Sequence, residues 1–506
     1  MSGPQDVAGG DANQAVQAIA GRPDSGQAAR EIGGANQTVH AIGSRLDSGQ
    51  AVHAIGQTVH IIGGGLAGSE AALQLAFRGV NVVLHEMRPT ASPPTHTSGD
   101  LAELVCSNSF KSTDLGTAQG LLKEELRRMG SALMRIAEAT ALPAGAALAV
   151  DRTQFSAWVT RCVTGHPNIR VVRECVHELP NAPCIVASGP LTQGELGGAI
   201  EQLVGEPLHF YDAAAPVVMA DSLDMNRIFA ASRHGKGGSD YLNCPMNEAE
   251  YETFLEALRQ AECAPVHGFE DKAVFEGCLP VEVLAGRGRD TLRFGAMKPV
   301  GLTDPKTDRR PYAVVQLRRE NAAGTMYNLV GFQTRLTFPE QRRVFGMIPG
   351  LGRAEYARYG VMHRNTFIRS PGRLMADYRL KAESNGVGAR SPVWIVGQLT
   401  GTEGYMAAIA GGLTAACGAY AYLKGMPPPD FTAKTVMGGL AHYVSEYIGK
   451  HFQPMGPAFG LLEPIVGRMS KPQRYQAYTE RSLALIDACI PDFAGEVQAY
   501  VDTFRE

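Results

Sequence analysis

The chain lacks several features that would assign it to a class at once. Its nine cysteines include no CxxC pair and no cysteine–histidine cluster at zinc spacing, so we expect no metal site. It contains no stretch of about 18 apolar residues, which predicts no transmembrane helix. The N-terminus has no basic start followed by an apolar run, so we expect no secretory signal, and a reducing cytoplasm fits best.

The chain also lacks a strong charge of either sign. Its net charge is −3, with 44% hydrophobic and 19% charged residues, an ordinary balance for a soluble globular protein. Its 506 residues are enough for more than one domain. One segment departs from this balance, because Gly286–Arg319 holds nine Lys or Arg and three Asp. A solvated face and a phosphate-binding patch are both open interpretations of this segment.

A near-repeat occurs three times, as QTVHAIG, QAVHAIG and QTVHIIG, and only the third copy continues into a glycine-rich run. The preceding residues, 1–56, are rich in Gly, Ala, Gln and Ser. We interpret 1–56 as a low-complexity, disordered extension. A targeting or partner-binding tail is the alternative.

The third copy begins a dinucleotide-binding pattern. TVHII, residues 58–62, is β-branched and apolar like a buried strand. A helix is predicted over 69–79 and a strand over Val80–His85, followed by Glu86, 18 residues after Gly68. Strand, G-x-G-x-x-G, helix, strand and acid in this order predict a Rossmann-like site in which the acid binds a ribose. The predicted cradle consists of Gly63, Gly64, Gly65, Leu66, Ala67 and Gly68.

Each glycine of this pattern has its own physical reason. Gly63 permits a tight turn, Gly65 lets the backbone approach a pyrophosphate, and Gly68 lets the helix pack closely on the strand. The helix N-terminus adds free N–H groups and a positive dipole end. A glycine-rich turn without function is the alternative.

The rest of the chain predicts a discontinuous α/β protein. The apolar strand CIVAS, residues 184–188, and the later strand VWIVG, residues 393–397, both suit a nucleotide-binding sheet. Between them, short β-like runs alternate with helical stretches, as in an inserted domain. We predict a dinucleotide-binding domain over 58–195 and 355–430, an α/β insertion domain over 196–354 and a helical C-terminal region over 431–506.

Several longer phrases resemble those of one family. They include IIGGGLAGSEAA, HEMRP, ELVCSNSFKS, PAGAALAVDR, FEGCLPVEVLAGRG, NLVGFQTRLTFPEQ and GQLTGTEGYMAAIAGG. On these phrases, which cover nearly all of 58–506, the chain resembles the folate- and FAD-dependent tRNA uracil-5-methyltransferases. That family is related to the flavoproteins that modify the tRNA wobble uridine, which lack ELVCSNS together with FEGC.

The resemblance implies an activity and a set of cofactors. FAD, reduced by NADH or NADPH, would carry a methylene group from 5,10-methylenetetrahydrofolate to carbon 5 of a uridine in the tRNA T loop, giving ribothymidine. The implied fold is a Rossmann-like FAD-binding domain with an insertion. The implied partners are tRNA and the folate and nicotinamide co-substrates, without a membrane. The oligomeric state stays open, with a homodimer as one candidate.

The resemblance also assigns two cysteines. Carbon 5 of uracil is a poor nucleophile, and a thiolate added to carbon 6 turns the base into an enolate that can attack a methylene group. The family's nucleophile position matches Cys278, in FEGC, and its acid/base position matches Cys106, in LVCSNS. From the residues alone, both would be buried structural cysteines. Cys278 needs a base or positive neighbours to ionise, and Arg287 and Arg289 are near it in sequence.

Further assignments follow from the same resemblance. Tyr405, in TGTEGY, falls where the family has a tyrosine beside the flavin, with a core tyrosine as the alternative. Glu86 would bind the adenosine ribose. HRN, residues 363–365, is a weaker candidate for folate or flavin contact, since a surface turn explains it almost as well. The target base must be flipped out at a cost of a few kcal/mol, and Gly286–Arg319 is the candidate for the offsetting contacts.

Two other functions stay open from the sequence. One is a flavin-dependent NAD(P)H oxidoreductase without an RNA substrate, and the other is a non-catalytic flavin-holding tRNA-binding protein. Wobble-uridine modification is disfavoured by the cysteine phrases and by the short helical tail. The 1–56 extension and the long connection Leu380–Pro392 depart from the family pattern, but neither touches a motif.

Overall fold

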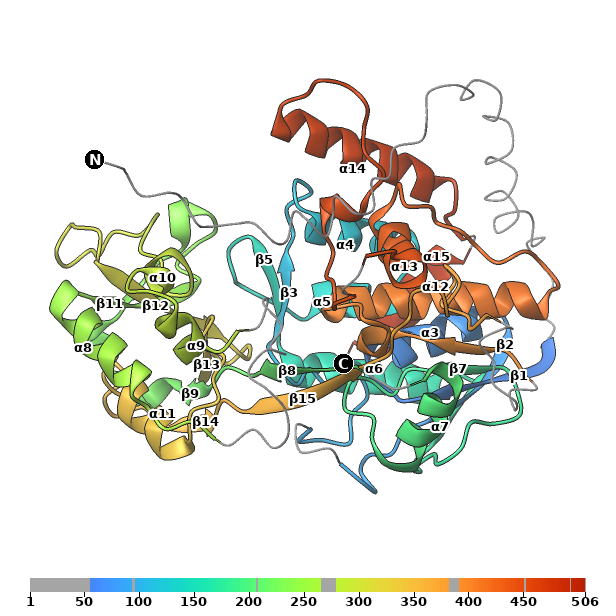
Figure 1. Ribbon diagram of the computed structural model, residues 1–506, viewed down its shortest axis with the longest axis horizontal. Helices are drawn as coiled ribbons and strands as arrows, with labels where there is room; N and C mark the ends of the chain where they lie inside the picture. The colour runs from blue at the N-terminus through green and yellow to red at the C-terminus, as the bar shows by residue number, and fades with distance from the viewer. Residues whose placement is uncertain are drawn as a thin grey trace.

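The computed structural model describes residues 55–92, 96–205, 208–264, 279–381, 391–449, 452–491 and 493–505. Two bodies stand side by side, each with its own buried core (Figure 1). The candidate nucleophile Cys278, nearly all of the 1–56 extension and most of Leu380–Pro392 lie outside the described residues.

A parallel five-stranded sheet forms the centre of the larger body, in the order β16-β7-β1-β2-β6. Successive residues such as Ile61 and Ile62 are both buried, as expected for parallel strands covered on both faces. The strands are β1 Ile55–Ile62, β2 Val80–His85, β6 Ile169–Val172, β7 Cys184–Val186 and β16 Val393–Ile395.

Two helices from distant parts of the chain pack together beside this sheet. They are α3 Leu66–Phe77 and α12 Tyr405–Leu423, and a Cβ on Gly412 would lie only 2.2 Å from the carbonyl oxygen of Ala67. Because β16 and α12 follow the insertion yet complete the sheet and its helical cover, the larger body is discontinuous. The predicted fold class, a discontinuous Rossmann-like domain with an α/β insertion and a helical C-terminal region, is confirmed.

Among the described residues, α12 is the helix long and apolar enough to cross a membrane by length and composition. We predicted no transmembrane helix because the sequence has no run of about 18 apolar residues, and α12 contains Gly, Thr and Tyr among its apolar residues. Of its apolar window, 78% is buried inside the protein, as in a core helix.

The smaller body contains a six-stranded sheet in the order β10-β11-β12-β13-β9-β14. Its strands are β9 Val217–Met219, β10 Phe229–Ala230, β11 Tyr241–Met246, β12 Ala313–Arg319, β13 Met326–Leu329 and β14 Tyr356–Arg358. Its helices are α8 Glu248–Arg259, α9 Val281–Gly286, α10 Thr291–Phe294 and α11 Phe338–Phe345. Asn247 and Glu250 form a capping box that fixes the start of α8.

An antiparallel pair of strands connects the two bodies (Figure 1). The chain enters the smaller body through β8 Leu208–Ala213 and returns through β15 Met362–Phe367. The weak candidates at 363–365 lie in β15. The domain boundaries at 196 and 354 stay predictions.

A small antiparallel sheet, β3-β5-β4, lies in the larger body, with β3 and β5 facing the insertion (Figure 1). Its strands are β3 Ser109–Ser112, β4 Ala141–Leu142 and β5 Ala147–Val150. The other helices of this body are α4 Ala118–Arg128, α5 Ala132–Ala139, α6 Arg152–Gly165 and α7 Gly194–Val204.

The C-terminal helices belong to the core of the larger body. They are α13 Val436–Glu446, α14 Lys471–Asp487 and α15 Ala494–Asp502. Buried Glu125 of α4 accepts hydrogen bonds from the first N–H groups of α13, at Val436 and Met437, and from Ser482 of α14. One carboxyl group thereby joins three helices.

Candidate functional site

The glycine turn after β1 has the geometry of a phosphate cradle. Gly63 has φ +101°, and a Cβ there would lie 2.5 Å from the carbonyl oxygen of Ala187, just after β7. A Cβ on Gly68 would lie 1.9 Å from the carbonyl oxygen of Gly63, so only glycine lets α3 start this close to the turn. A Cβ on Gly65 would meet no atom within 4 Å. Gly65 therefore borders open space at the N-terminus of α3, where a pyrophosphate fits.

Glu86 lies directly after β2 and is 5% exposed. One of its oxygens accepts a hydrogen bond from the N–H of Gly64 at 2.8 Å, and the other accepts from the backbone N–H and Nε of Arg88 at 3.0 and 2.8 Å. Burial opposes the charge, but the hydrogen bonds from Arg88 outweigh it and hold the pKa of Glu86 below its usual range. This ionised carboxylate beside the glycine turn fits a ribose acceptor. Its assignment to FAD, with Gly64, Leu66 and Ala67, stays a prediction.

Cys106 lies on the irregular loop that leads into β3, and the first residue of α12 holds this loop. The hydroxyl of Tyr405 accepts hydrogen bonds from the N–H of Cys106 at 2.9 Å and of Ser107 at 3.1 Å. Its ring centroid lies 5.6 Å from that of Phe110. Burial raises the pKa of Tyr405, so the hydroxyl stays neutral. The structure thus places Tyr405 against the cysteine loop, while its predicted contact with the flavin stays a prediction.

Three arginines hold the same loop. Arg358 donates to the carbonyl oxygen of Cys106 at 3.3 Å and to that of the preceding residue at 3.0 Å. Arg318 donates to the side chain of Asn108 at 2.9 Å, and Arg152 donates to the carbonyl two residues before Cys106 at 2.9 Å. Burial lowers the pKa of Arg318 and of Arg358, yet guanidinium groups keep their charge at neutral pH. Positive charge of this kind favours the thiolate form of a neighbouring cysteine.

The sequence pattern did not identify Arg152 or Arg358 as site residues. Arg152 pairs with buried Glu320 at 2.8 Å, so the arginines outnumber the acid around the loop. The sequence does not identify an arginine as a site residue when its hydrogen-bond partners come from distant segments. Only Arg318 could have been suspected, because it lies within the basic segment.

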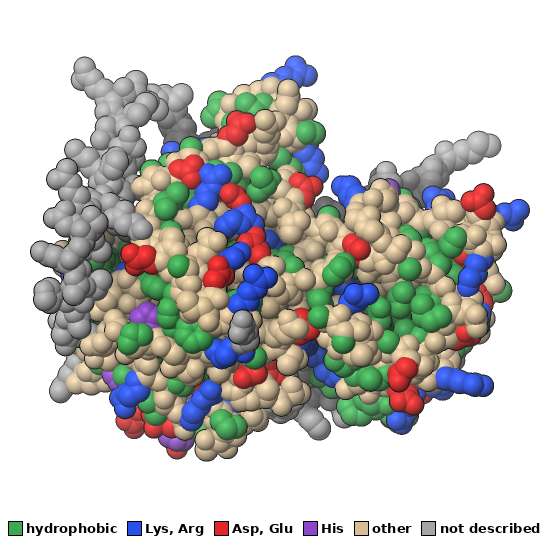
Figure 2. Space-filling view, turned by 180° about the vertical axis from the view of Figure 1, so that it is seen from behind, with side chains coloured by type: hydrophobic (Ala, Val, Ile, Leu, Met, Phe, Trp, Pro, Cys, Tyr) green, Lys and Arg blue, Asp and Glu red, His purple; other side chains and the backbone are tan. Residues whose placement is uncertain are grey.

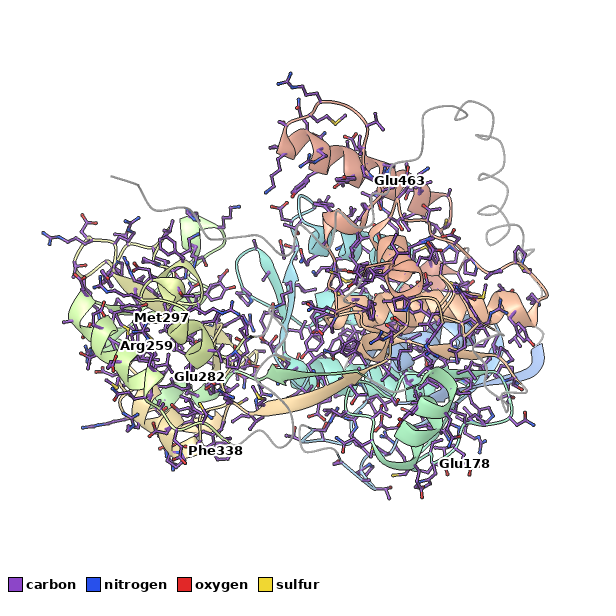
Figure 3. All side chains as sticks on the ribbon, in the orientation of Figure 1. Glu178, Arg259, Glu282, Met297, Phe338 and Glu463 are labelled. Atoms are coloured by element: carbon purple, nitrogen blue, oxygen red, sulfur yellow. The ribbon has the colours of Figure 1, made fainter. Side chains whose placement is uncertain are left out.

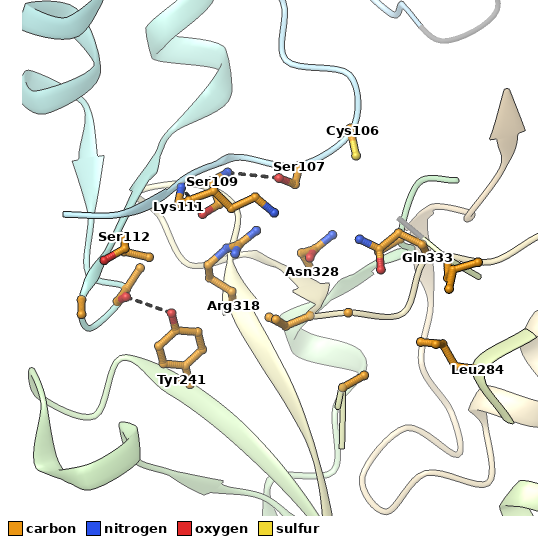
Figure 4. Close-up of a pocket in the computed structure, with 18 residues that line it drawn as sticks. Cys106, Ser107, Ser109, Lys111, Ser112, Tyr241, Leu284, Arg318, Asn328 and Gln333 are labelled. Atoms are coloured by element: carbon orange, nitrogen blue, oxygen red, sulfur yellow. Dashed lines mark hydrogen bonds between the residues drawn. The ribbon is translucent and has the colours of Figure 1, made fainter. Parts of the chain in front are cut away.

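A cavity of about 620 Å³ lies beside this loop, between the two bodies (Figure 4). The larger body supplies Cys106 and the start of β3, and the smaller body supplies β12, β13 and the residues that follow them. The polar lining consists of Cys106, Ser107, Ser109, Lys111, Ser112, Tyr241, Arg318, Asn328 and Gln333. A cavity between domains that is lined by both apolar and polar side chains is a typical place for a substrate site.

The residues that directly follow Cys278 lie at this cavity. Leu279 lines the cavity, and the N–H of Val281 donates to the carbonyl oxygen of Gln333 at 2.7 Å. Glu282 is buried at the start of α9 in the smaller body (Figure 3). The residues that follow Cys278 are therefore anchored at the cavity wall.

Among the described cysteines, Cys106 alone lines the cavity. Burial raises the pKa of Cys162 to about 12 and that of Cys489 to about 11, which makes these thiols poor nucleophiles. No group of three or more His, Cys, Asp and Glu that could hold a metal ion occurs within the described part of the chain. The buried cysteines are Cys162, Cys184, Cys244, Cys417 and Cys489.

The basic segment Gly286–Arg319 is divided among several environments. Arg289 pairs with two glutamates of α8, at 2.5 and 2.8 Å, and Arg293 lies 3.7 Å from the centre of a tyrosine ring. Arg318 faces the cavity. On the face shown in Figure 2, basic and acidic side chains of the described residues are interspersed. The exposed basic residues of the segment include Lys298, Lys306, Arg309 and Arg310.

Comparison with known proteins gives consistent matches over most of the chain. The family model of Glucose inhibited division protein A matches residues 58–427. A relative from Heliobacterium modesticaldum is 53% identical over 433 residues, 85% of this chain and 97% of the relative. A relative from Geobacter sulfurreducens is 52% identical over 431 residues, 85% of this chain and 98% of the relative. Both are named methylenetetrahydrofolate--tRNA-(uracil-5-)-methyltransferase TrmFO.

Solved structures show the same fold at low sequence identity. Aquifex aeolicus GidA in its form II crystal aligns with a TM-score of 0.61 and 13% identity, covering 87% of this chain and 75% of that chain. The form I crystal aligns with a TM-score of 0.58 and 14% identity, covering 88% and 78%.

Proposed function

The chain belongs to the family of methylenetetrahydrofolate--tRNA-(uracil-5-)-methyltransferases named TrmFO, and from this premise we propose that it methylates carbon 5 of a tRNA uridine. The carbon comes from 5,10-methylenetetrahydrofolate, the uridine is that of the T loop, and the product is ribothymidine. The observation that carries the proposal is the position of Cys106, on a loop held by arginines at the edge of the cavity between the two bodies.

The two cysteines have complementary roles in this proposal. The thiolate of Cys278 adds to carbon 6 of the uracil, which makes carbon 5 nucleophilic. After the methylene group is attached, the thiolate of Cys106 takes the proton from carbon 5 as the bond between the methylene carbon and its carrier breaks. A hydride, which bound reduced FAD would supply, completes the methyl group, and Cys278 leaves carbon 6 as a thiolate. The arginines that hold the Cys106 loop support a negative charge there. The anchoring of Leu279 at the same cavity supports the placing of both cysteines on one substrate.

FAD is the cofactor that we assign to the glycine turn. Gly65 leaves room for its pyrophosphate, Gly63 and Gly68 let the turn and the helix pack closely beside it, and Glu86 offers an acceptor for its ribose. Bound FAD would supply the redox chemistry that moves and reduces the folate carbon, with NADH or NADPH as the reductant. Tyr405 would border its ring, because the N-terminus of α12 meets the Cys106 loop.

The tRNA would approach along the smaller body. The exposed side chains of Arg309 and Arg310 are available for phosphate contacts, whereas Arg289 is already paired with α8 and Lys306 donates to the carbonyl oxygen of Asn226. The T-loop base must leave its stack to enter the cavity. A cytoplasmic location and a homodimer belong to the same proposal.

The proposal is tested by following labelled carbon from 5,10-methylenetetrahydrofolate into an unmodified tRNA transcript, with FAD-loaded protein and NADH or NADPH. We expect label at carbon 5 of the T-loop uridine with the wild type and no release of ribothymidine with Cys278→Ala. Cys263→Ala is the matched control, because Cys263 is half-buried in the smaller body and does not line the cavity. Oxidation of the nicotinamide without label in RNA would favour a plain oxidoreductase instead.

A further inference from the structure

Asn328 is an unusual buried residue of the cavity wall. It lines the cavity, the residue is 2% exposed, and its Nδ2 has no hydrogen-bond partner among the residues that the structure describes. A buried amide N–H without a partner is unfavourable by about 1–3 kcal/mol, and natural proteins contain few of them. An unpaired donor on a residue that lines a cavity therefore points to a ligand beside it.

The sheet holds Asn328 rigidly in this position. Its strand, β13, lies between β12 and β9, with Asn328 opposite Arg318 on one side and opposite Val217 on the other. The side chain cannot reach a partner by a shift of the backbone. Asn328 is therefore preorganised for whatever enters the cavity.

A second buried asparagine of the same sheet uses its amide for hydrogen bonds within the fold. Asn243 of β11 is 0% exposed, and its Nδ2 donates to three backbone carbonyls, while its Oδ1 accepts from Gln316 at 2.9 Å. The hydrogen-bonding capacity of Asn243 is used within the protein. The Nδ2 of Asn328 makes no hydrogen bond with the described residues, although both residues are asparagines and both are buried.

The amide of Asn328 lies between the strands of the smaller body and the loop that carries Cys106 and Ser107 (Figure 4). Gln333, which lines the same side of the cavity, supplies a second amide. The thiol and the amides thus belong to opposite walls. A flat ring bound in this cavity with one edge at Cys106 would therefore have its opposite edge at Asn328.

We propose that Asn328 is the residue that recognises the target base as uracil, by donating from Nδ2 to a ring carbonyl and accepting the N3–H at Oδ1. This inference rests on the proposed function. In a uracil ring, N3 and the O2 carbonyl lie directly across from carbons 6 and 5, so a ring with carbon 5 at Cys106 presents its N3–H and O2 to β13. Cytosine has two acceptors on that edge, N3 and O2, so in neither orientation can one amide pair with both of them.

Stability separates this role from a structural one. Asn328→Leu removes a buried donor that has no partner and replaces it with an apolar group of similar size, so we expect an unchanged or higher melting temperature. Asn243→Leu, the matched control, breaks several hydrogen bonds and should melt lower by several degrees. A clear fall in the melting temperature of Asn328→Leu would show that the amide serves the fold and would overturn the proposal.

Activity gives the second readout. With FAD-loaded protein, Asn328→Leu and Asn328→Asp should lower kcat/KM for the tRNA by about 100-fold or more, because a site built to pair a polar edge loses its partner. The flavin absorbance and the KM for 5,10-methylenetetrahydrofolate should stay at wild-type values. In competition, Asn328→Asp should lose the preference for a T-loop uridine over a cytidine at the same place.

Two results would contradict the assignment. One is wild-type discrimination between uridine and cytidine by Asn328→Asp, and the other is a change confined to the KM for the folate, which would place the pterin ring against Asn328. If the wild-type protein transfers no label to tRNA at all, the proposed function itself fails. Active wild type with unaffected variants rejects the role of Asn328 alone.

Discussion

The hydroxyl of Tyr405 accepts a hydrogen bond from the backbone N–H of Cys106 at 2.9 Å, although the two residues are 299 positions apart. Tyr405 is the first residue of α12, which completes the discontinuous domain, and Cys106 lies on the loop at the cavity. The contact therefore links the segment that returns to the larger body with the position of Cys106.

Replacement of Tyr405 by phenylalanine should loosen this loop. The change leaves two backbone N–H groups without their acceptor, and we expect a loss of about 1–3 kcal/mol in the free energy of unfolding together with a lower kcat. Denaturant unfolding and label transfer measure the two effects. Tyr443→Phe, which removes a hydrogen bond to Gln453 away from the cavity, should lower stability alone. Equal kcat values for the two variants would contradict a role for Tyr405 at the site.

The glycines of the turn should separate cofactor binding from folding. Gly65→Ala places a methyl group in open space, so the apoprotein should melt like the wild type while its affinity for FAD falls. Gly68→Ala forces a contact of 1.9 Å with the carbonyl oxygen of Gly63, so both the melting temperature and FAD affinity should fall. Calorimetry of the apoproteins and flavin titration measure these differences. Normal FAD affinity in Gly65→Ala would place the pyrophosphate elsewhere.

The exposed arginines should contribute to RNA affinity in proportion to the phosphates that they contact. Arg309→Gln and Arg310→Gln should each weaken tRNA binding and reduce the slope of log K against log salt by about 1. Arg289→Gln is the control, since its guanidinium is already paired with Glu248 and Glu252. Binding isotherms at several salt concentrations distinguish the variants. Equal slopes for all three would remove this surface from the RNA interface.

His442 should make stability fall at alkaline pH. Its hydrogen bond with Asp430, and then that with Glu446, outweigh its burial and raise the pKa of His442 to about 9. Because this value exceeds that of an unfolded histidine, about 6.5, the contribution is fully present below pH 6.5 and is lost as the pH rises through about 9. Melting temperatures from pH 6 to 10 should show this loss in the wild type. The loss attributable to this group should be absent in His442→Gln.

The sequence by itself determined the local parts of this protein. Local properties within about thirty residues predict the strand, the glycine turn, the helix and the acid Glu86. These properties are side-chain size, hydrophobic period and backbone freedom, and each depends only on residues that are close in the sequence. The inserted domain was also predictable, since strand-like runs resume after it. The phrases around Cys106 and Cys278 carried the family resemblance.

Tertiary structure decided which residues surround Cys106. Arg152, Arg318 and Arg358 come from three separate elements, and neither their charge nor their spacing marks them as partners of one loop. The same holds for Asn328, because only the folded protein shows that its Nδ2 is buried without a partner among the described residues. Burial and pairing are properties of the packed molecule, because they arise between segments that are distant along the chain.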